Sequence, residues 1–206
     1  MFKLRLFIVK KILLSLCFLS SVAFASPQGE LTDRLNQNKG FEASFTQKVL
    51  SPEGDVLMQG EGDVKILRPN LFRWHTQTPD ENLLVTDGKT LWYYNPFVEQ
   101  VTLMGLDQAT TQTPFVLLTR NKASDWDNYS VAQNGDAFTV SPKSDSAIKS
   151  EFIVRIQPSG KVTGFSVVEQ DGQRSDFNFT TFEAKKPAQS NFMFTVPDGV
   201  DIDDQR

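Results

Sequence analysis

The chain has 206 residues, with 21 basic side chains, 25 acidic side chains and a single cysteine, Cys17. Four basic residues and Cys17 lie in the first 25 residues, so the other 181 residues carry 17 basic and 25 acidic side chains, a net charge of −8. Beyond residue 25 this composition excludes disulfides and thiolate metal sites, and it disfavours long-range attraction to nucleic acid or anionic membranes.

The first 25 residues, MFKLRLFIVKKILLSLCFLSSVAFA, predict a cleaved secretory signal peptide. They combine a basic start, a short apolar run and a small-residue cleavage site at Ala23-Phe24-Ala25. An uncleaved membrane anchor is the alternative, but the apolar run is short for a membrane span. Cys17 follows Leu16, which is not small, so we do not expect the chain itself to be lipidated. Residues 26–206 are expected to form a single domain.

The first predicted element is a short amphipathic helix over residues 28–39, with Leu31 and Leu35 on one face and Gly40 at its end. The pattern then alternates as in a β-strand, FEASFTQKV over 41–49 and DVLMQGEGDVKI over 55–66. Gly60 and Gly62 inside the second strand predict a bulge, a bend or a close backbone approach.

Turn sequences then recur at short intervals, such as Asp87-Gly88, Asn134-Gly135 and Asp171-Gly172. Dipeptides of this kind close hairpins, so the segments between them predict about ten antiparallel strands in up-and-down order. Residues 106–122, LDQATTQTPFVLLTRNK, interrupt this rhythm. Thr113 and Pro114 suit a helix start, and the apolar run 115–118 predicts a short inserted helix with contacts on more than one side.

Aromatic residues are concentrated in the predicted strands, and 13 of the 17 Phe lie beyond residue 25. The stretch LWYYNPF, residues 91–97, carries large rings at positions that face both sides of a strand. A well-filled core explains any single ring. The whole set favours a concave apolar face that is covered by the 113–121 helix and binds a hydrophobic ligand, with the other face of this strand in outer packing.

Catalytic signatures are absent from the sequence: it contains no G-x-S-x-G, P-loop or H-E-x-x-H motif, and His75 is the only histidine. We therefore expect no catalytic residues, no metal and no cofactor, and a surface or hydrogen-bonded role for His75. Asp87 and Asp171 precede glycines and are expected in turns. The Asp201–Asp204 stretch lacks the glycine and distal glutamate of a calcium loop.

Several long and irregular blocks resemble one known family, the periplasmic outer-membrane lipoprotein carriers of the LolA type. The similarity runs in order over nearly the whole chain after residue 25. The blocks are RPNLFRWH (68–75), PDENLLVTDGKTLWYYNPFVEQ (79–100), TPFVLLTRN (113–121), SDW (124–126), FSVVEQDGQRS (165–175) and GVDIDDQR (199–206).

The resemblance implies a mainly β fold with short helices, an open, incomplete antiparallel β-barrel of about eleven strands with a helical lid over an apolar cavity. It implies a non-enzymatic, monomeric carrier in the periplasm of a Gram-negative bacterium. Such a carrier receives triacylated lipoproteins from an inner-membrane ABC transporter (LolCDE type). It shields their acyl chains and delivers them to an outer-membrane acceptor lipoprotein (LolB type).

The resemblance also assigns roles to residues. Arg68 carries over as the lid latch, which hydrogen-bonds lid carbonyls, and Phe72 as a residue for partner and cargo handling. Position 73 is Arg where an uncharged polar residue is expected, so it is open whether Arg73 shares the latch role. The acyl-chain cavity and lid carry over to Phe41, Trp74, Trp92, Phe115, Leu117, Leu118 and Phe165.

Two other classes of function stay open on the sequence. One is a periplasmic sensor or glycolipid-binding protein on a similar half-barrel, and the other is a secreted hydrolase with an unrecognised site. A hydrolase would turn over lipid or ester substrates, whereas a carrier would bind them unchanged.

Overall fold

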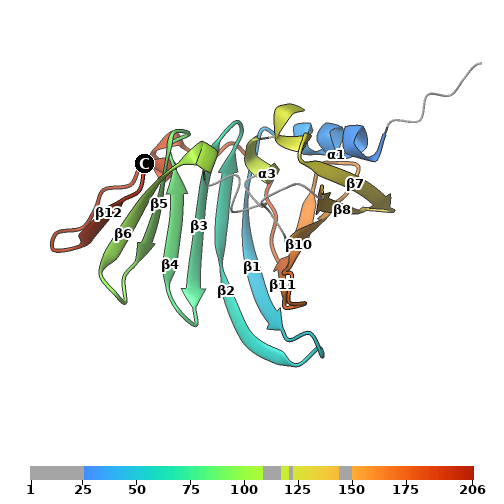
Figure 1. Ribbon diagram of the computed structural model, residues 1–206. Coiled ribbons are helices and arrows are strands. Elements are labelled where there is room, and N and C mark those ends of the chain that lie inside the picture. The colour runs from blue at the N-terminus through green and yellow to red at the C-terminus, as the bar shows by residue number, and fades with distance from the viewer. Residues whose placement is uncertain (1–25, 109–116, 121–122, 144–149) are drawn as a thin grey trace, which may run out of the picture.

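The computed structural model describes residues 26–108, 117–120, 123–143 and 150–206, which fold mainly as β-sheet (Figure 1). The strands are β1 (Gly40–Leu50), β2 (Val56–Leu67), β3 (Leu71–Thr78), β4 (Asn82–Thr86), β5 (Thr90–Asn95), β6 (Gln100–Gly105), β7 (Tyr129–Asn134), β8 (Ala137–Pro142), β9 (Glu151–Ile156), β10 (Val162–Val168), β11 (Arg174–Phe179) and β12 (Asp201–Asp204). The helices are α1 (Pro27–Asn36) and α3 (Leu117–Arg120), with 3-10 turns η2 (Ala123–Trp126) and η3 (Gln189–Phe192). The predicted signal peptide and positions 113–116 and 121 of the predicted helix lie outside the described residues, and positions 117–120 of that helix form α3.

The described strands form one sheet in the order β12-β6-β5-β4-β3-β2-β1-β11-β10-β9-β8-β7. Figure 1 shows this sheet curling from β12 on one side to β7 on the other, and no pairing joins these two end strands in the described residues. The prediction of an open, mainly antiparallel sheet is confirmed. The sheet has twelve strands in place of about eleven, and the sequence did not predict β12, which runs parallel to β6.

Side chains alternate along β1 as the sequence predicts, with Phe41, Ala43, Phe45 and Val49 all buried. In β2 the same alternation buries Val64 and Ile66 but leaves Val56 50% exposed. The reason is that β3 pairs with β2 only from Glu61 onward. The β1–β2 hairpin therefore projects beyond the neighbouring strands (Figure 1).

Gly62 allows two strands and an aromatic ring to approach one another closely. A Cβ atom at this position would lie 2.1 Å from the His75 carbonyl oxygen and 2.6 Å from Cζ of Phe45. The pairing of β2 with β3 also shifts register between Glu61 and Gly62. The prediction of a bulge or close approach at this glycine is confirmed.

Helix α1 begins where Ser26 accepts a hydrogen bond from the Gly29 N–H at 3.1 Å. Leu31 is fully buried, and Arg34 Nη1 donates to Asp136 Oδ1 and to the Ile156 carbonyl, both at 2.7 Å. These contacts fix α1 on the β8–β9 side of the sheet. The predicted end of the helix is corrected: α1 stops at Asn36, and Gly40 opens β1 instead, since a Cβ there would lie 2.7 Å from the Ile66 carbonyl oxygen.

The C-terminal segment covers the outer face of β3 to β6. Phe192 in η3 is 1% exposed, and the Phe194 ring lies 5.8 Å from Tyr94 and 6.3 Å from Trp92. A second, smaller apolar layer thus lies behind the sheet, opposite the main core. None of the helices in the described part of the chain has the length and apolar character to cross a membrane.

Candidate functional site

The aromatic strand β5 divides its rings between the two faces of the sheet. Tyr93 pairs with Leu84 and lines an inner cavity, whereas Trp92 and Tyr94 lie on the outer face against Phe194. The prediction that one face serves a cavity and the other serves outer packing is confirmed. Trp92 itself is corrected: the alternation of the strand places it behind the sheet, and the structure does not bring it to the concave face.

The concave face carries a connected set of aromatic rings across the middle strands. Trp74 stacks on Phe45 at 4.1 Å and meets Phe177 edge-on at 5.2 Å. Phe165 stacks on Phe177 at 4.6 Å, and its centroid lies 5.7 Å from Trp74. Rings held in this way form a broad apolar surface, which is largely buried in this form and is of the kind that suits a flexible hydrocarbon.

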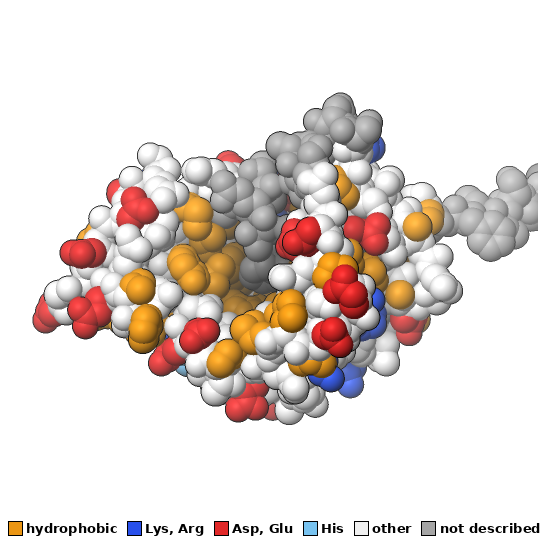
Figure 2. Space-filling model, turned by 60° about the horizontal axis from the view of Figure 1, so that its bottom comes forward, with side chains coloured by type: hydrophobic (Ala, Val, Ile, Leu, Met, Phe, Trp, Pro, Cys, Tyr) orange, Lys and Arg blue, Asp and Glu red, His pale blue; other side chains and the backbone are white. Residues whose placement is uncertain are grey.

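A cavity of about 470 Å³ opens at the edge of this aromatic surface. Trp74, Phe177 and Tyr93 contribute to its wall, together with polar residues nearer the opening. Figure 2 shows hydrophobic side chains gathered in the hollow of the molecule and acidic side chains around its border. A volume of this size lies in the range of small-molecule sites.

Arg68, the candidate latch, connects the sheet to the segment that covers it. Its Nη1 donates to the Asn38 carbonyl and its Nη2 to the Leu118 carbonyl in α3, both at 2.7 Å. The guanidinium also lies 6.0 Å from the centre of the Phe41 ring. The structure thus brings this arginine and a backbone carbonyl of the covering helix together.

Burial makes the Arg68 contact costly for the charged side chain. Desolvation lowers the pKa of Arg68 from its ordinary value to about 10, and its Nε has no partner in the described residues. No carboxylate pairs with it there, unlike the usual buried arginine. Arg73 alternates onto the outer face with His75, so the structure gives it no contact with α3.

The other predicted cavity and lid residues are placed as follows. Phe72 is fully buried beside Ile66, so it has no exposed surface for a partner in this form. Leu117 and Leu118 in α3 are each 1% exposed and belong to the same buried core as Phe41, Trp74 and Phe165. Phe115 lies outside the described residues.

Sequence reasoning missed three contributors to this site. Phe45 and Phe177 complete the ring cluster, and the parity that Phe45 shares with Phe41 in β1 could have identified it. Arg120, at the end of α3, binds Asp125 with Nη2 to Oδ1 at 2.8 Å and also contacts Asp107. This ion-pair cluster joins α3 to the segments before and after it, and no sequence pattern indicated it.

The polar residues considered for catalysis occupy structural positions. His75 lies on the outer face, with Nδ1 3.3 Å from Asp63 Oδ2 and Nε2 2.9 Å from Glu81 Oε1. Asp87 Oδ1 accepts from the Thr90 N–H, and Asp171 Oδ1 accepts from the Gln173 N–H, both at 2.9 Å. These two aspartates are turn residues, as predicted.

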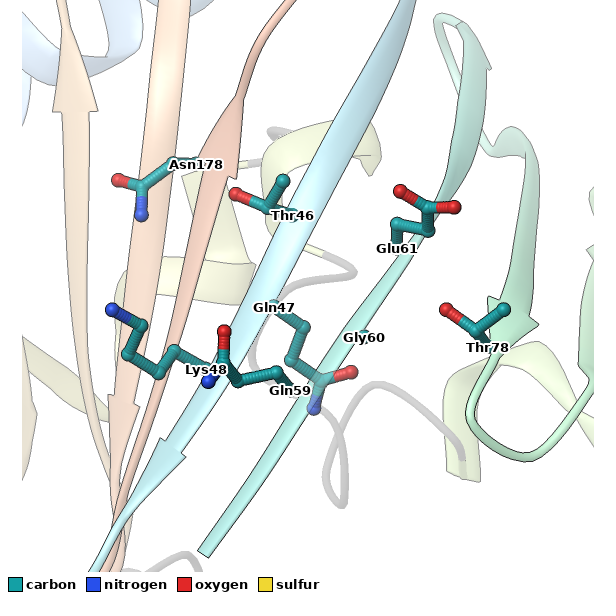
Figure 3. Close-up of a pocket in the computed structure, with 8 residues that line it drawn as sticks. All are labelled: Thr46, Gln47, Lys48, Gln59, Gly60, Glu61, Thr78 and Asn178. Carbon is teal, nitrogen blue, oxygen red and sulfur yellow. The ribbon is translucent and has the colours of Figure 1, made fainter. Parts of the chain in front are cut away.

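A second cavity, of about 430 Å³, lies where β1 and β2 extend beyond β3. Figure 3 shows that polar side chains line it, among them Lys48, Gln59 and Glu61. Thr46 and Lys48 alternate with the buried positions of β1 and so lie on its outer face, and Gln47 between them also lines this cavity. Its polar wall offers nothing to a hydrocarbon chain.

Comparison with known sequences gives matches over most of the chain. A family model described as "Outer membrane lipoprotein carrier protein LolA" matches residues 36–195. The outer-membrane lipoprotein carrier protein of Aliivibrio fischeri (strain MJ11) is 87% identical over 198 residues, which cover 96% of this chain and 100% of that protein. The protein of the same name from Photobacterium profundum is 62% identical over 188 residues, 91% of this chain and 94% of the relative.

Solved structures resemble the fold at much lower sequence identity. A LolA superfamily protein from Nitrosomonas europaea aligns with a TM-score of 0.50 and 12% identity, over 83% of this chain and 99% of that chain. An uncharacterised conserved protein from Thermus thermophilus aligns with a TM-score of 0.52 and 13% identity, over 85% of this chain and 98% of that chain. At these identities the likeness concerns the fold alone.

Proposed function

The chain belongs to the LolA family of outer-membrane lipoprotein carriers, which carry cargo without catalysing a reaction, and we propose that it encloses the acyl chains of its lipoprotein on the concave face. The main support is the aromatic inner face beneath α3, with Arg68 joined to the Leu118 carbonyl. The cargo chains would lie against Trp74, Phe165 and their neighbours.

The energetics of acyl chains in water explain the need for such a face. Each buried methylene gains roughly 0.8 kcal/mol, so three chains of about 15 methylenes lose on the order of 35 kcal/mol when exposed to water. A water-soluble route between two membranes therefore requires a protein that shields the chains.

Release requires that this gain be partly offset. Leu117 and Leu118 of α3 pack into the same buried core that the cargo would use, so loading has to displace them. The cost of opening lowers the net affinity by the fraction of molecules that are competent to bind. A covering helix held by a desolvated arginine suits this task, because the contact is strong enough to close the site and weak enough to open.

The finer assignments follow from the family. We propose that residues 1–25 direct export and are removed, and that residues 26–206 act as one domain in the periplasm of a Gram-negative bacterium. The cargo would be triacylated lipoproteins, received from an inner-membrane ABC transporter of the LolCDE type and passed to an acceptor lipoprotein of the LolB type. Arg68 would act as the latch, and Phe72 would serve partner or cargo handling once the site is open.

The test uses spheroplasts and the purified protein spanning residues 26–206. We expect the protein to move outer-membrane lipoproteins into the soluble fraction, and native mass spectrometry to show a one-to-one complex with intact cargo. No release from spheroplasts with an active transporter, despite correct folding of the added protein, would instead support the sensor or glycolipid-binding alternative. Cleaved cargo would support a hydrolase.

A further inference from the structure

The opening of the 470 Å³ cavity differs in chemistry from its aromatic interior. Thr76 of β3 pairs with Asn82 of β4, and Asn95 of β5 follows Tyr94, which pairs with the residue next to Asn82. We call these three side chains, together with Gln47 of β1, the polar row of the cavity. Gln47 of β1 lines the same cavity, and so does Tyr93, one position inward from Asn95. The next row toward the interior begins with Trp74 and Leu84. The wall of the cavity therefore changes from apolar in the interior to polar at the opening, between the pair Trp74–Leu84 and the pair Thr76–Asn82.

The polar row retains unused hydrogen-bonding groups. Among the described residues, Asn82 Nδ2 donates to the Asp80 carbonyl at 3.1 Å, and Asn95 Oδ1 accepts from the Phe97 N–H at 3.0 Å. No hydrogen bond in that part of the chain uses the side chains of Gln47, Thr76 or Tyr93, or the Nδ2 of Asn95. Amide N–H and hydroxyl donors of this kind suit carbonyl oxygens.

Charge at the opening argues against a phosphate-bearing ligand. Among the described residues, the cavity has no lysine or arginine in its wall, and the carboxylates of Asp80 and Glu81 border it instead. Phosphate is normally bound by arginine, lysine or clustered backbone N–H groups, and carboxylates repel it. The Glu81 carboxylate contacts His75, so Asp80 is the carboxylate that we choose for substitution.

We propose that this polar row recognises the uncharged ester and amide carbonyls at the head of the acyl chains, and that Asp80 and Glu81 disfavour phosphate-bearing lipids. The inference rests on the proposed function, since it assigns the head of the same ligand whose chains occupy the aromatic interior. It makes the site selective for an acylated cysteine, with its glycerol esters and N-acyl amide, over a phospholipid with identical chains.

The experiment measures displacement of an apolar fluorescent dye from the protein spanning residues 26–206 by two probes with palmitoyl chains. One is a synthetic tripalmitoylated cysteine lipopeptide with a neutral peptide, and the other is dipalmitoylphosphatidylglycerol. We expect the wild type to prefer the lipopeptide. Gln47→Leu with Thr76→Val should weaken lipopeptide binding about 25-fold, since one net hydrogen bond is worth roughly five-fold, while dye binding stays unchanged.

A second pair of variants tests the charge. Asp80→Asn should raise phosphatidylglycerol binding about five-fold at low salt and less at high salt, because a like-charge contact is removed. Asp198→Asn, an exposed aspartate elsewhere, is the matched control for this change, and Thr46→Val on the outer face of β1 is the control for the polar row. Both controls should leave all three affinities unchanged.

The outcomes separate the two proposals. A wild type that binds neither the dye nor the lipopeptide contradicts the proposed function itself. A wild type that binds both probes equally, or a double variant that loses the dye and the lipopeptide in the same proportion, overturns the polar-row inference and leaves the carrier intact. If the double variant fails to fold, Gln47→Leu alone decides, because Gln47 is only half-buried.

Discussion

At the scale of single residues, Arg68 combines a favourable contact with an unfavourable burial. Its two hydrogen bonds to carbonyls at 2.7 Å are charge-assisted, but the fall of its pKa to about 10 corresponds to a cost of about 3 kcal/mol for keeping the buried guanidinium charged. Opening α3 would return the side chain to water and remove that cost. The net contribution of Arg68 to the closed form is therefore the small difference between the free energy gained from its hydrogen bonds and the free energy lost by burying its charge.

Arg68→Leu should shift the protein toward the open, loaded form. The change removes both carbonyl bonds and leaves a leucine beside Phe41, so α3 loses its tie to the sheet. We expect cargo to be accepted, bound about ten-fold more tightly and transferred poorly to the acceptor. The measurements are the release of lipoprotein cargo from spheroplasts into the soluble fraction by the added protein, and the later transfer of that cargo to the acceptor. Arg73→Leu, on the outer face, is the control and should behave as wild type. Normal transfer by Arg68→Leu would refute the latch.

The same arginine predicts a pH dependence of stability. Its pKa is about 10 in the folded chain and has its higher, ordinary value in the unfolded chain, so between these two values the unfolded chain binds more protons. The contribution of Arg68 to the free energy of unfolding should therefore rise with pH in this window. Below about pH 9 this contribution should not depend on pH. Tyr129 acts in the opposite direction, because burial raises its pKa to about 12.

The difference between wild type and Arg68→Leu isolates this effect, since Tyr129 is common to both. Urea unfolding at about pH 9 and about pH 11 should show wild type gaining about 1 kcal/mol relative to the variant. A constant difference over this range would mean that water reaches the guanidinium in the folded protein.

The sequence indicated which residue types form the site better than it indicated which face of the sheet each side chain lies on. The resemblance named Phe41 and Trp74, and the structure buries both of them on the inner side of β1 and β3. In β5 the rings occupy both parities, so the sequence alone could not tell that Tyr93 faces inward and Trp92 outward. Trp92 packs on the outer face against Phe194, which is about 100 residues away in the sequence, so no local pattern could reveal this contact. The Asn38 contact of Arg68 likewise depends on packing.

At the scale of elements, the close packing of β2 against β3 and the Phe45 ring depends on Gly62. A methyl group there would collide with the His75 carbonyl oxygen and the Phe45 ring, and a backbone atom in the sheet cannot move aside cheaply. We expect Gly62→Ala to lower the free energy of unfolding by about 3 kcal/mol, the upper end for overpacking. Gly105→Ala is the control, because nothing lies within 4 Å of a Cβ at that position. Equal urea midpoints for the two variants would contradict this account.

The C-terminal segment should stabilise the sheet without taking part in binding. Phe192 is 1% exposed on the outer face, so Phe192→Ala leaves a cavity there and should cost about 3 kcal/mol. Met193→Ala, at a side chain 74% exposed, should be neutral. Thermal unfolding measures the loss of stability in Phe192→Ala. Dye binding is measured at low temperature, where both variants stay folded, and we expect both to bind an apolar fluorescent dye as the wild type does. A selective loss of dye binding would place the segment in the site.

Element boundaries show where sequence patterns stop being informative. The alternating strands and their glycine turns were predicted because a sheet with one buried side imposes a period of two. Strand β12 was missed since its sequence, Asp-Ile-Asp-Asp, has no apolar face, and it forms only because β6 offers an unpaired edge. Gly40 suggested a helix cap, whereas its function is to let β1 approach β2.

At the scale of the whole molecule, the aromatic face has to be reachable and yet closed. A curved open sheet supplies one large concave side without a second sheet to fill it, and leucines of α1 and α3 contribute to the core on that side. The acidic side chains around the hollow in Figure 2 keep an open apolar site soluble. The incomplete closure of the sheet thus suits the proposed carrier function, in which the covering helix α3 would move to admit the cargo.

Movement of α3 can be followed with a single reactive group, because the chain has no cysteine after residue 25. Leu118 is 1% exposed, so a thiol in Leu118→Cys should react slowly with a water-soluble maleimide in the empty protein. Loading with a triacylated lipopeptide should raise the rate at least about ten-fold, and Arg68→Leu should raise it without ligand, because both release the Leu118 carbonyl. Met193→Cys, on an exposed side chain, should react rapidly in every state. If Leu118→Cys stays protected in the loaded protein, the acyl chains enter without displacing α3, and competition between helix and cargo is not the means of release.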